Sequence, residues 1–340
     1  MSAFTKESFL GLLPDMTELE VMARDVSPRH YFRAHRQNGS TAIIMAYPSP
    51  DEKSLKELEG FIKISAWMAQ RGLRVPALIA HDEAHAMAAF EDLGRTSFGK
   101  VLHGGLLSKD ELYETAAEPL TIIRDIPATE CEWLPSYYKS YIHYNRRDLV
   151  TYYAPLKTGK KSDDALMESY LAAWEKIEKS LPLCPMGFVH GDYHLENLMY
   201  IEGGKNPAER CALIDYQDAM YGPLPYDLVN LLEDARVSVP VDIQQRVLEH
   251  YCAPMNKEQE YAFRSWYRVL GTQFHCRVIG LFIKLAQIQG RDQYLVHVPR
   301  LQDYIAREIE DPILLPLKEW FAASGIDFKA LDLQGLQLAS

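Results

Sequence analysis

The residues best suited to chemistry lie in one short polar segment in the second half of the chain. Residues 190–197 read His-Gly-Asp-Tyr-His-Leu-Glu-Asn, and an apolar segment at 211–214 runs directly into Asp215. Asp192 and Asn197 stand five residues apart, which is the spacing of the base and a metal ligand in a phosphoryl-transfer loop. Carboxylate and amide oxygens are also the ligands that Mg²⁺ prefers. The segment therefore predicts Asp192 as catalytic base and Asn197 as a ligand of Mg²⁺.

A second carboxylate is needed to complete this metal site. Residues 198–201 and 211–214 are apolar and flank Glu-Gly-Gly-Lys at 202–205, a pattern typical of a β-hairpin. Such a hairpin would bring Asp215 beside Asn197, so we expect both side chains to bind the metal.

The elements that must position these residues differ between the two ends of the chain. Before residue 94, an Asn-Gly turn and apolar residues at helical spacing predict four strands and one helix, at 31–36, 41–47, 75–80, 86–90 and 53–70. After residue 94 the pattern is mostly helical, and a capping box at 108–111 opens a helix that Pro119 is expected to kink or end. Further helices are predicted at 162–181, 226–236 and 257–289.

This change of pattern predicts an α+β protein of two domains. We expect a small N-terminal lobe with an antiparallel sheet over residues 1–94 and a larger, mostly helical C-terminal lobe over residues 95–340. Clefts between two such lobes are common ligand sites.

The composition narrows the class of partner. The chain has 340 residues, 47% of them hydrophobic and 24% charged, as in ordinary globular proteins. Its 36 basic and 47 acidic side chains give a formal net charge of −11, a poor match for nucleic acid or an anionic membrane. No apolar run approaches the ~20 residues of a membrane span, and five cysteines without a C-x-x-C pair predict reduced thiols. We therefore expect a cytoplasmic protein whose substrate is a small molecule.

The motif H-G-D-x-H-x-x-N at 190–197, followed by Ile214-Asp215, resembles the aminoglycoside phosphotransferase and choline kinase superfamily. The resemblance implies a two-lobed protein-kinase-like fold, with ATP bound between a nucleotide-binding N-terminal lobe and a catalytic C-terminal lobe. It also implies a catalytic base at Asp192 and Mg²⁺ ligands at Asn197 and Asp215. The expected enzyme is a kinase that phosphorylates an alcohol group.

A longer segment resembles one subgroup more closely. Residues 214–229 include Tyr-Gln-Asp-Ala-Met-Tyr-Gly-Pro and are similar to the bacterial anomeric kinases of N-acetylmuramate and N-acetylglucosamine, as are 27–33, 72–76 and 91–94. This implies an amino sugar as acceptor, phosphorylated at its anomeric hydroxyl. Two alternatives stay open, namely an aminoglycoside phosphotransferase and a non-catalytic kinase-fold module that binds nucleotide.

Two departures from the kinase pattern concern the nucleotide. No G-x-G-x-x-G is present, so the phosphates need other partners, for which we expect Ser27, Arg29 and Arg33. The phosphate-binding lysine of the third strand is replaced by an apolar residue, which we place at Met45. The resemblance puts the adenine edge against the backbone from Glu91 to Leu93.

Other side chains are expected to assist the reaction. The resemblance gives His190 and Asp227 the task of bracing the catalytic loop, while Asp227 also suits the positive end of a helix dipole. Gln217 and Asp218 follow the predicted metal ligand Asp215 and are candidates for contact with the acceptor, although Asp218 also fits a plain turn.

The last long predicted helix carries two basic side chains, Arg277 and Lys284. A solvated basic face is the default explanation, and contact with an acidic group of the substrate is the alternative. A tyrosine-rich segment at 137–153 leaves a similar choice between packing and stacking on a sugar ring.

Overall fold

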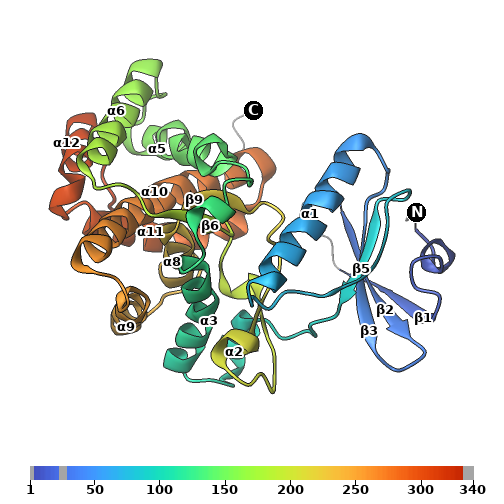
Figure 1. The fold of residues 1–340 in the computed structure, drawn as a ribbon. Coiled ribbons are helices and arrows are strands. Elements are labelled where there is room, and N and C mark those ends of the chain that lie inside the picture. The colour runs from blue at the N-terminus through green and yellow to red at the C-terminus, as the bar shows by residue number, and fades with distance from the viewer. Residues whose placement is uncertain (1–3, 23–28, 332–340) are drawn as a thin grey trace. The chain divides into compact units, whose positions relative to one another are not determined.

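The computed structural model describes residues 4–22 and 29–331, and Figure 1 labels its main elements. The strands are β1 (Met16–Val21), β2 (His30–Arg36), β3 (Thr41–Ala46), β4 (Leu78–Asp82), β5 (Met87–Glu91), β6 (Met186–Val189), β7 (Leu198–Tyr200), β8 (Cys211–Leu213) and β9 (Met220–Pro223). The α-helices are α1 (Glu52–Gln70), α2 (Phe98–Gly104), α3 (Lys109–Arg124), α4 (Tyr141–Tyr144), α5 (Ala154–Thr158), α6 (Asp164–Ser180), α7 (Pro207–Arg210), α8 (Pro225–Leu232), α9 (Val241–Cys252), α10 (Lys257–Gln289), α11 (Val298–Glu308) and α12 (Leu315–Ser324). Short 3₁₀ helices and one π-helix, η5, complete the chain: η1 (Lys6–Phe9), η2 (Ala128–Glu130), η3 (Tyr137–Lys139), η4 (Asn145–Arg147), η5 (Leu149–Tyr153), η6 (Leu195–Asn197), η7 (Asp292–His297) and η8 (Pro312–Leu314).

Contacts between residues divide the chain into two compact units. The first unit comprises Met1–Ile122 and His194–Ala219, and the second comprises Ile123–Tyr193 and Met220–Ser340. These units do not coincide with the predicted domain boundary after residue 94. The first unit extends to Ile122, and the segment His194–Ala219, which contains β7 and β8, also belongs to it. The division of function between residues 1–94 and 95–340 stays a prediction.

The first unit is built on a five-stranded antiparallel sheet in the order β1-β2-β3-β5-β4. The turn between β2 and β3 lies where the sequence predicts it. Gly39 has a φ of 81°, and the Asn38 side chain accepts a hydrogen bond from the backbone N–H of Ser40 at 2.9 Å. The sequence analysis missed β1 because polar residues fill half of its positions.

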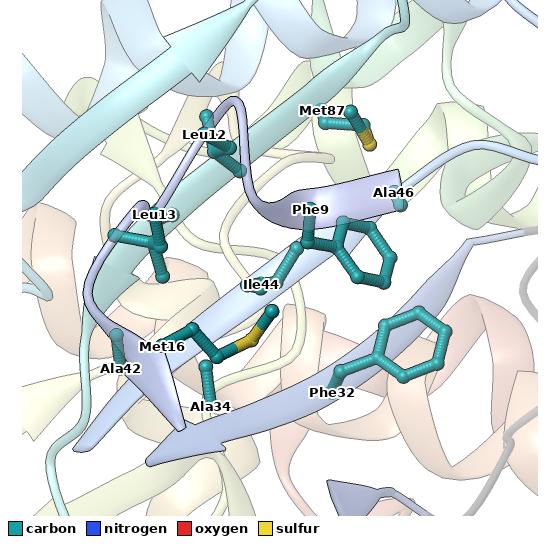
Figure 2. Close-up of a cluster of buried hydrophobic side chains, with 11 residues drawn as sticks. Phe9, Leu12, Leu13, Met16, Phe32, Ala34, Ala42, Ile44, Ala46 and Met87 are labelled. Atoms are coloured by element: carbon teal, nitrogen blue, oxygen red, sulfur yellow. The ribbon is translucent and has the colours of Figure 1, made fainter. Parts of the chain in front are cut away.

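One face of this sheet is covered by the N-terminal segment (Figure 2). The ring of Phe9 lies 5.0 Å from the ring of Phe32 on β2, and both side chains are fully buried. Burial of such a side chain contributes roughly 1.5–3 kcal/mol. The cluster also includes Leu12, Leu13, Met16, Ala34, Ala42, Ile44, Ala46, Met87 and Ala89. The segment before β1 therefore belongs to the core that keeps the sheet in place.

Helix α1 lies beside β5 in the first unit (Figure 1). It begins after Asp51, whose side chain accepts a hydrogen bond from Ser54 N at 2.8 Å. Phe61 of α1 meets Phe90 of β5 edge to face at 5.1 Å and stacks on Tyr216 at 4.9 Å. The helix therefore connects the sheet to the segment that follows β8.

The predicted hairpin is present as β7 and β8, paired from Leu198 opposite Leu213 onward. Its connection contains one short helix, α7, which the sequence analysis missed. Leu213 N donates to the carbonyl of Arg74 at 2.8 Å, and Tyr200 N donates to the carbonyl of Thr96 at 2.9 Å. These bonds fix the hairpin to the strand-rich part of the first unit.

The second unit is organised around α10, which runs over the predicted range. Asn256 caps its start with hydrogen bonds from Glu258 N and Gln259 N, and Gly290 with a φ of 64° ends it. By length and composition alone α10 is apolar enough to cross a membrane. However, 78% of its most apolar 18-residue window is buried, as expected of a core helix. It packs against α8, η5 and α11.

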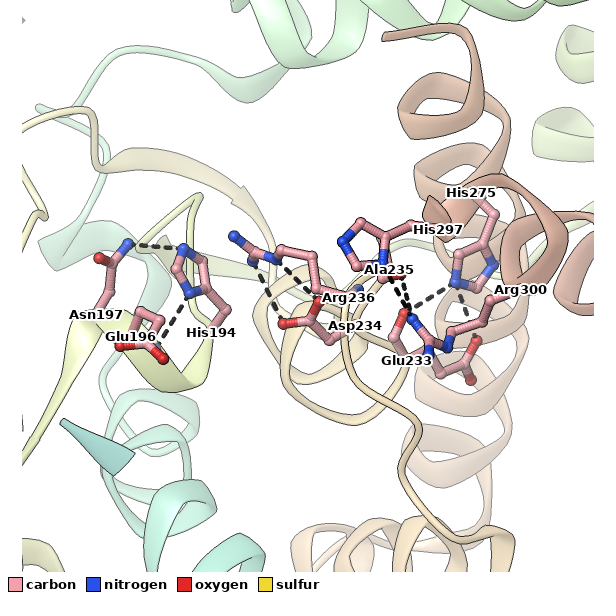
Figure 3. Close-up of polar contacts among 10 residues, drawn as sticks. All are labelled: His194, Glu196, Asn197, Glu233, Asp234, Ala235, Arg236, His275, His297 and Arg300. Carbon is pink, nitrogen blue, oxygen red and sulfur yellow. Dashed lines mark hydrogen bonds and ion pairs between the residues drawn. The ribbon is translucent and has the colours of Figure 1, made fainter. Parts of the chain in front are cut away.

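A buried polar cluster joins α10 to its neighbours (Figure 3). His275 donates from Nε2 to the carbonyl of Glu233 at 3.0 Å, and its Nδ1 lies 2.9 Å from a carboxylate oxygen of Glu308. Burial disfavours the charged imidazolium, but Glu308 outweighs burial and raises the pKa of His275. We interpret the cluster as a buried ion pair that fixes how α8, α10 and α11 pack.

Two helices differ from their predicted bounds. α3 continues through Pro119 to Arg124, so of the two expected effects of this proline, a kink or an end, the end is excluded. α8 ends at Leu232 and not at residue 236. The strand pair β6–β9 was also not predicted, because its short strands carry too few residues to show alternation.

Candidate active site

The first unit contains a cavity of about 350 Å³ whose wall is largely apolar. Ile43 and Met45 come from β3, and Phe90 comes from the end of β5. Phe61 and Tyr216 add the stacked rings described above. The volume is within the range of small-molecule and cofactor sites, and the apolar, aromatic lining suits an aromatic base.

Polar groups enter the same cavity at two places. The segment Glu91–Gly94 follows β5 and forms one edge, and the predicted metal ligands Asn197 and Asp215 lie at another, with Gln217. The Glu91 carboxylate forms an ion pair with Arg74 at 2.5 Å, and the hydrogen bond within this pair lowers the pKa of Glu91. The backbone of the segment, and not the carboxylate of Glu91, therefore remains the predicted contact for a base.

Arg33 lines this cavity but is held by the segment that forms its edge. Its Nε lies 2.5 Å from Asp92 Oδ2, and its Nη2 donates to Asp92 Oδ1 and to the carbonyl of Gly94, both at 3.0 Å. Burial works to raise the pKa of Asp92, but hydrogen bonds from Arg33 and Gly94 outweigh it and lower that pKa. In this structure Arg33 fixes the cavity edge, and its predicted role toward phosphate stays a prediction.

Met45 lines the cavity and lies on β3, at the position where the sequence predicts an apolar residue in place of the phosphate-binding lysine of kinases. It pairs with Tyr31 across β2 and β3, and the Tyr31 hydroxyl donates a hydrogen bond to its sulfur at 3.6 Å. Burial raises the pKa of Tyr31, so its hydroxyl keeps its proton. At the position predicted to replace the kinase lysine, the structure therefore has an apolar thioether beside a neutral phenol.

The hairpin positions the two predicted metal ligands. Ile214 N donates to the carbonyl of Asn197 at 3.1 Å, which brings Asp215 next to the backbone of Asn197. Asp215 has a φ of 63°, a left-handed conformation rare for a residue with a side chain and often found at functional sites. The amide nitrogen of Asn197 lies 3.2 Å from Nε2 of His194, so its oxygen points away from that ring (Figure 3). One amide and one carboxylate oxygen fit the hard-ligand preference of Mg²⁺.

The predicted catalytic loop begins in the second unit, where β6 runs into His190. Asp227, in the first turn of α8, accepts hydrogen bonds from His190 N at 2.6 Å and from Gly191 N at 2.9 Å. Gly191 has a φ of 90°, which a residue with a Cβ adopts only with strain. Asp192 N donates to Nδ1 of His190 at 3.3 Å, while the Asp192 side chain is exposed. The loop is therefore held through its backbone, which leaves the carboxylate of Asp192 accessible.

Burial raises the pKa of Asp227 to about 7, against the opposing effect of the two backbone N–H donors. The side chain of Asp227 is 1% exposed, as is that of His190. These contacts are those expected of residues that brace the loop, and their effect on turnover stays a prediction.

Comparison with known proteins identifies the family. Residues 18–267 match the Phosphotransferase enzyme family. The chain belongs to this family. It is 27% identical over 330 residues to the N-acetylmuramate/N-acetylglucosamine kinase of Caulobacter vibrioides, covering 89% of this chain and 90% of the relative. A protein of the same name from Pseudomonas aeruginosa is 29% identical, covering 90% of this chain and 88% of the relative.

Solved structures agree with the predicted fold class. The choline kinase LicA from Streptococcus pneumoniae aligns with a TM-score of 0.59 at 14% identity, over 91% of this chain and 97% of that chain. An ADP-bound aminoglycoside phosphotransferase aligns with a TM-score of 0.57 at 15% identity, over 89% and 97% of the two chains. The α+β, kinase-like fold that the sequence predicts is confirmed, as is the resemblance on which it rested.

Four further residues of this phosphotransferase were predicted to contact the nucleotide phosphates or the acceptor: Ser27, Arg29, Gln217 and Asp218. Ser27 lies outside the described residues, and Arg29 is described but is not among the residues that line the cavity. The Arg29 charge acts instead on the neighbouring Tyr31 and Tyr47 hydroxyls, whose pKa values it lowers against the larger effect of burial. Gln217 lines the cavity, and its buried Oε1 has no hydrogen-bond partner among the described residues. Asp218 is exposed and accepts a hydrogen bond from Gln217 Nε2 at 3.3 Å.

Sequence reasoning missed the support of the metal-ligand segment in this phosphotransferase. Ser97 Oγ donates to Glu196 Oε2 at 2.7 Å, directly before Asn197 in the chain. A Cβ added at Gly99 would lie 1.8 Å from Glu196 Oε1, so a larger residue there would displace the Glu196 side chain. In the sequence, only the position of Glu196 inside the motif could have indicated this support. Its partners lie about a hundred residues away, so no local pattern connects them to it.

Proposed function

We propose that this phosphotransferase transfers the γ-phosphate of ATP to an amino sugar, N-acetylmuramate or N-acetylglucosamine, at the anomeric hydroxyl. Four relatives that carry the name N-acetylmuramate/N-acetylglucosamine kinase match most of both chains at 27–29% identity. The observation that carries the proposal is that these matches extend through the loop that holds Asp192. None of the five cysteines, all of which lie in the described part of the chain, forms a disulfide, which agrees with a cytoplasmic enzyme.

The acceptor hydroxyl would lose its proton to the exposed carboxylate of Asp192. The acceptor oxygen then forms a bond to the γ-phosphorus while the bond to the β–γ bridging oxygen breaks, and ADP leaves. Asn197 and Asp215 would bind Mg²⁺, which neutralises phosphate charge when bound. The apolar cavity with Met45 and Phe90 would bind the adenine, and the backbone of Glu91–Leu93 would contact its edge.

This proposal gives Gln217 a role toward the substrates. Its side-chain oxygen is buried in the cavity without a hydrogen-bond donor among the residues described, and such a group costs free energy unless a ligand satisfies it. Gln217 follows Asp215 by two positions, so a hydroxyl of ribose or of the acceptor would supply the missing donor.

The test is ATP consumption measured with a panel of acceptors: N-acetylmuramate, N-acetylglucosamine, kanamycin and choline. We expect both amino sugars to be phosphorylated, with kcat/KM at least tenfold above that of kanamycin. Higher kcat/KM with kanamycin would make the protein an aminoglycoside phosphotransferase. ATP binding without turnover of any acceptor would make it a non-catalytic nucleotide-binding module.

A further inference from the structure

We infer that Arg277 on α10 recognises a carboxylate of the acceptor, so that the enzyme distinguishes an acidic sugar from a neutral one. The inference rests on the proposed function and names the part of the acceptor that this residue binds. N-acetylmuramate carries a lactyl carboxylate, and N-acetylglucosamine has a hydroxyl at that position.

The positive charge of Arg277 is not paired with a carboxylate in the described part of the chain. Its Nη2 donates to the hydroxyl of Tyr226 at 3.1 Å, and its guanidinium lies 5.5 Å from the ring centroid of Phe274. In the described part of the chain no carboxylate forms an ion pair with Arg277, and its buried Nε has no hydrogen-bond partner. The side chain as a whole is partly exposed, so a ligand has access to it.

The other basic residue of this helix provides the contrast. Lys284 is paired with Asp148 at 3.8 Å and lies 5.4 Å from the ring of Tyr152. Asp148 is the carboxylate whose pKa responds to both cations, and Lys284 is the one that contacts it. Of the two basic residues singled out in the sequence, Lys284 therefore has a carboxylate within ion-pair distance, and Arg277 has none among the described residues.

The position of Arg277 connects it to the catalytic loop. Tyr226, its hydrogen-bond partner, directly precedes Asp227, which holds His190 and Gly191. Both Arg277 and Asp192 are close enough to act electrostatically on the Tyr226 hydroxyl. These residues all belong to the second unit. An acceptor whose hydroxyl meets Asp192 would therefore extend toward a guanidinium.

The chemistry of Arg277 matches a carboxylate. A guanidinium is planar and always charged, and it donates charge-assisted hydrogen bonds to the oxygens of a carboxylate. A hydrogen bond to a charged group contributes about 1.5–3 kcal/mol, which corresponds to about 10- to 150-fold in kcat/KM. The aromatic side chains around Arg277 strengthen such a pair because they exclude water.

The experiment compares kcat/KM for N-acetylmuramate and N-acetylglucosamine in the wild type, Arg277→Gln, Arg277→Lys and Lys284→Gln. We expect Arg277→Gln to lower the ratio of acidic to neutral sugar at least tenfold, through a higher KM for the acidic sugar. Arg277→Lys should restore part of that ratio. Lys284→Gln is the matched control on the same helix, and its ratio should stay within threefold of wild type.

A purely structural role for Arg277 predicts an equal loss for both sugars in Arg277→Gln, and that result would overturn the inference. An unchanged ratio of kcat/KM for the acidic sugar to kcat/KM for the neutral sugar in both Arg277 variants would also overturn the inference. Failure of the proposed function is seen separately, as a wild type that phosphorylates neither sugar. In that case thermal shift with N-acetylmuramate decides: stabilisation of the wild type that Arg277→Gln loses and Arg277→Lys keeps in part supports the inference, while no stabilisation of the wild type, or equal stabilisation of Arg277→Gln, refutes it.

Discussion

Replacing Asp227 by asparagine separates the activity of this enzyme from its stability. The Asp227 carboxylate accepts hydrogen bonds from His190 N at 2.6 Å and Gly191 N at 2.9 Å. An asparagine oxygen can accept only one of these bonds, and its NH₂ group faces the other donor. The loss of one charge-assisted bond costs about 1.5–3 kcal/mol. If the loop bears this cost in the transition state, kcat/KM falls about 10- to 150-fold.

At neutral pH the same substitution is expected to increase the stability of the protein, although it lowers the activity. The pKa of Asp227 is raised by burial from 3.8 to about 7, which corresponds to about 4 kcal/mol. The folded state thus binds this proton more tightly than the unfolded chain does. The stability that it provides is fully present below about pH 4 and is lost as the pH rises through about 7. The asparagine side chain would not ionise, so the variant avoids that loss.

We therefore expect the free energy of unfolding of Asp227→Asn, relative to wild type, to rise between pH 5 and pH 8 by about 2–3 kcal/mol. Urea denaturation at several pH values measures it, and steady-state kinetics measures the loss of activity. Asp242→Asn is the control, because Asp242 is exposed on α9 beside Arg246. Parallel stability curves for wild type and Asp227→Asn would refute the raised pKa. A variant with more than half of the wild-type kcat/KM would refute the bracing role.

Three further changes test the metal site, the cavity edge and the loop. Asp215→Ala should abolish Mg²⁺-dependent transfer but leave weak metal-free ATP binding, measured by calorimetry; intact Mg²⁺-dependent turnover would show that the metal site is elsewhere. Arg33→Met should destabilise the protein by about 3–5 kcal/mol in urea denaturation, because Asp92 is left buried without its cation; a loss below 1 kcal/mol would contradict the importance of that pair. Gly191→Ala should lower kcat more than it raises KM, because φ is 90° there and Asp192 follows directly; unchanged kcat would argue against a strained loop.

The features that the sequence predicts well depend on neighbours along the chain. The spacing of Asp192 and Asn197, the Asn38-Gly39 turn and the range of α10 are all set within a few residues or by a regular repeat. The hairpin that carries Asp215 was also predicted, since its two strands are close in sequence. Such local patterns contain most of the information about the catalytic segment.

The features that the sequence does not reveal depend on distant partners. The contact of Arg33 with Asp92, which lies 59 residues away, could not be read from the sequence, and the role of Arg33 toward phosphate stays a prediction. Glu196 and Ser97 are separated by 99 residues, and no pattern in either segment indicates their bond. The difference between Arg277 and Lys284 is of the same kind, because Asp148 on another segment pairs with only one of them.

Phosphorus NMR of the reaction product tests the central claim most directly. The enzyme is incubated with ATP, Mg²⁺ and N-acetylmuramate, and Asp192→Asn serves as the comparison. We expect an acid-labile sugar 1-phosphate resonance that appears together with ADP, and a rate of formation about 10²- to 10⁴-fold lower in the variant. ADP without a sugar phosphate, or a variant that retains more than about a tenth of the wild-type rate, would contradict an amino-sugar kinase that uses Asp192 as its base.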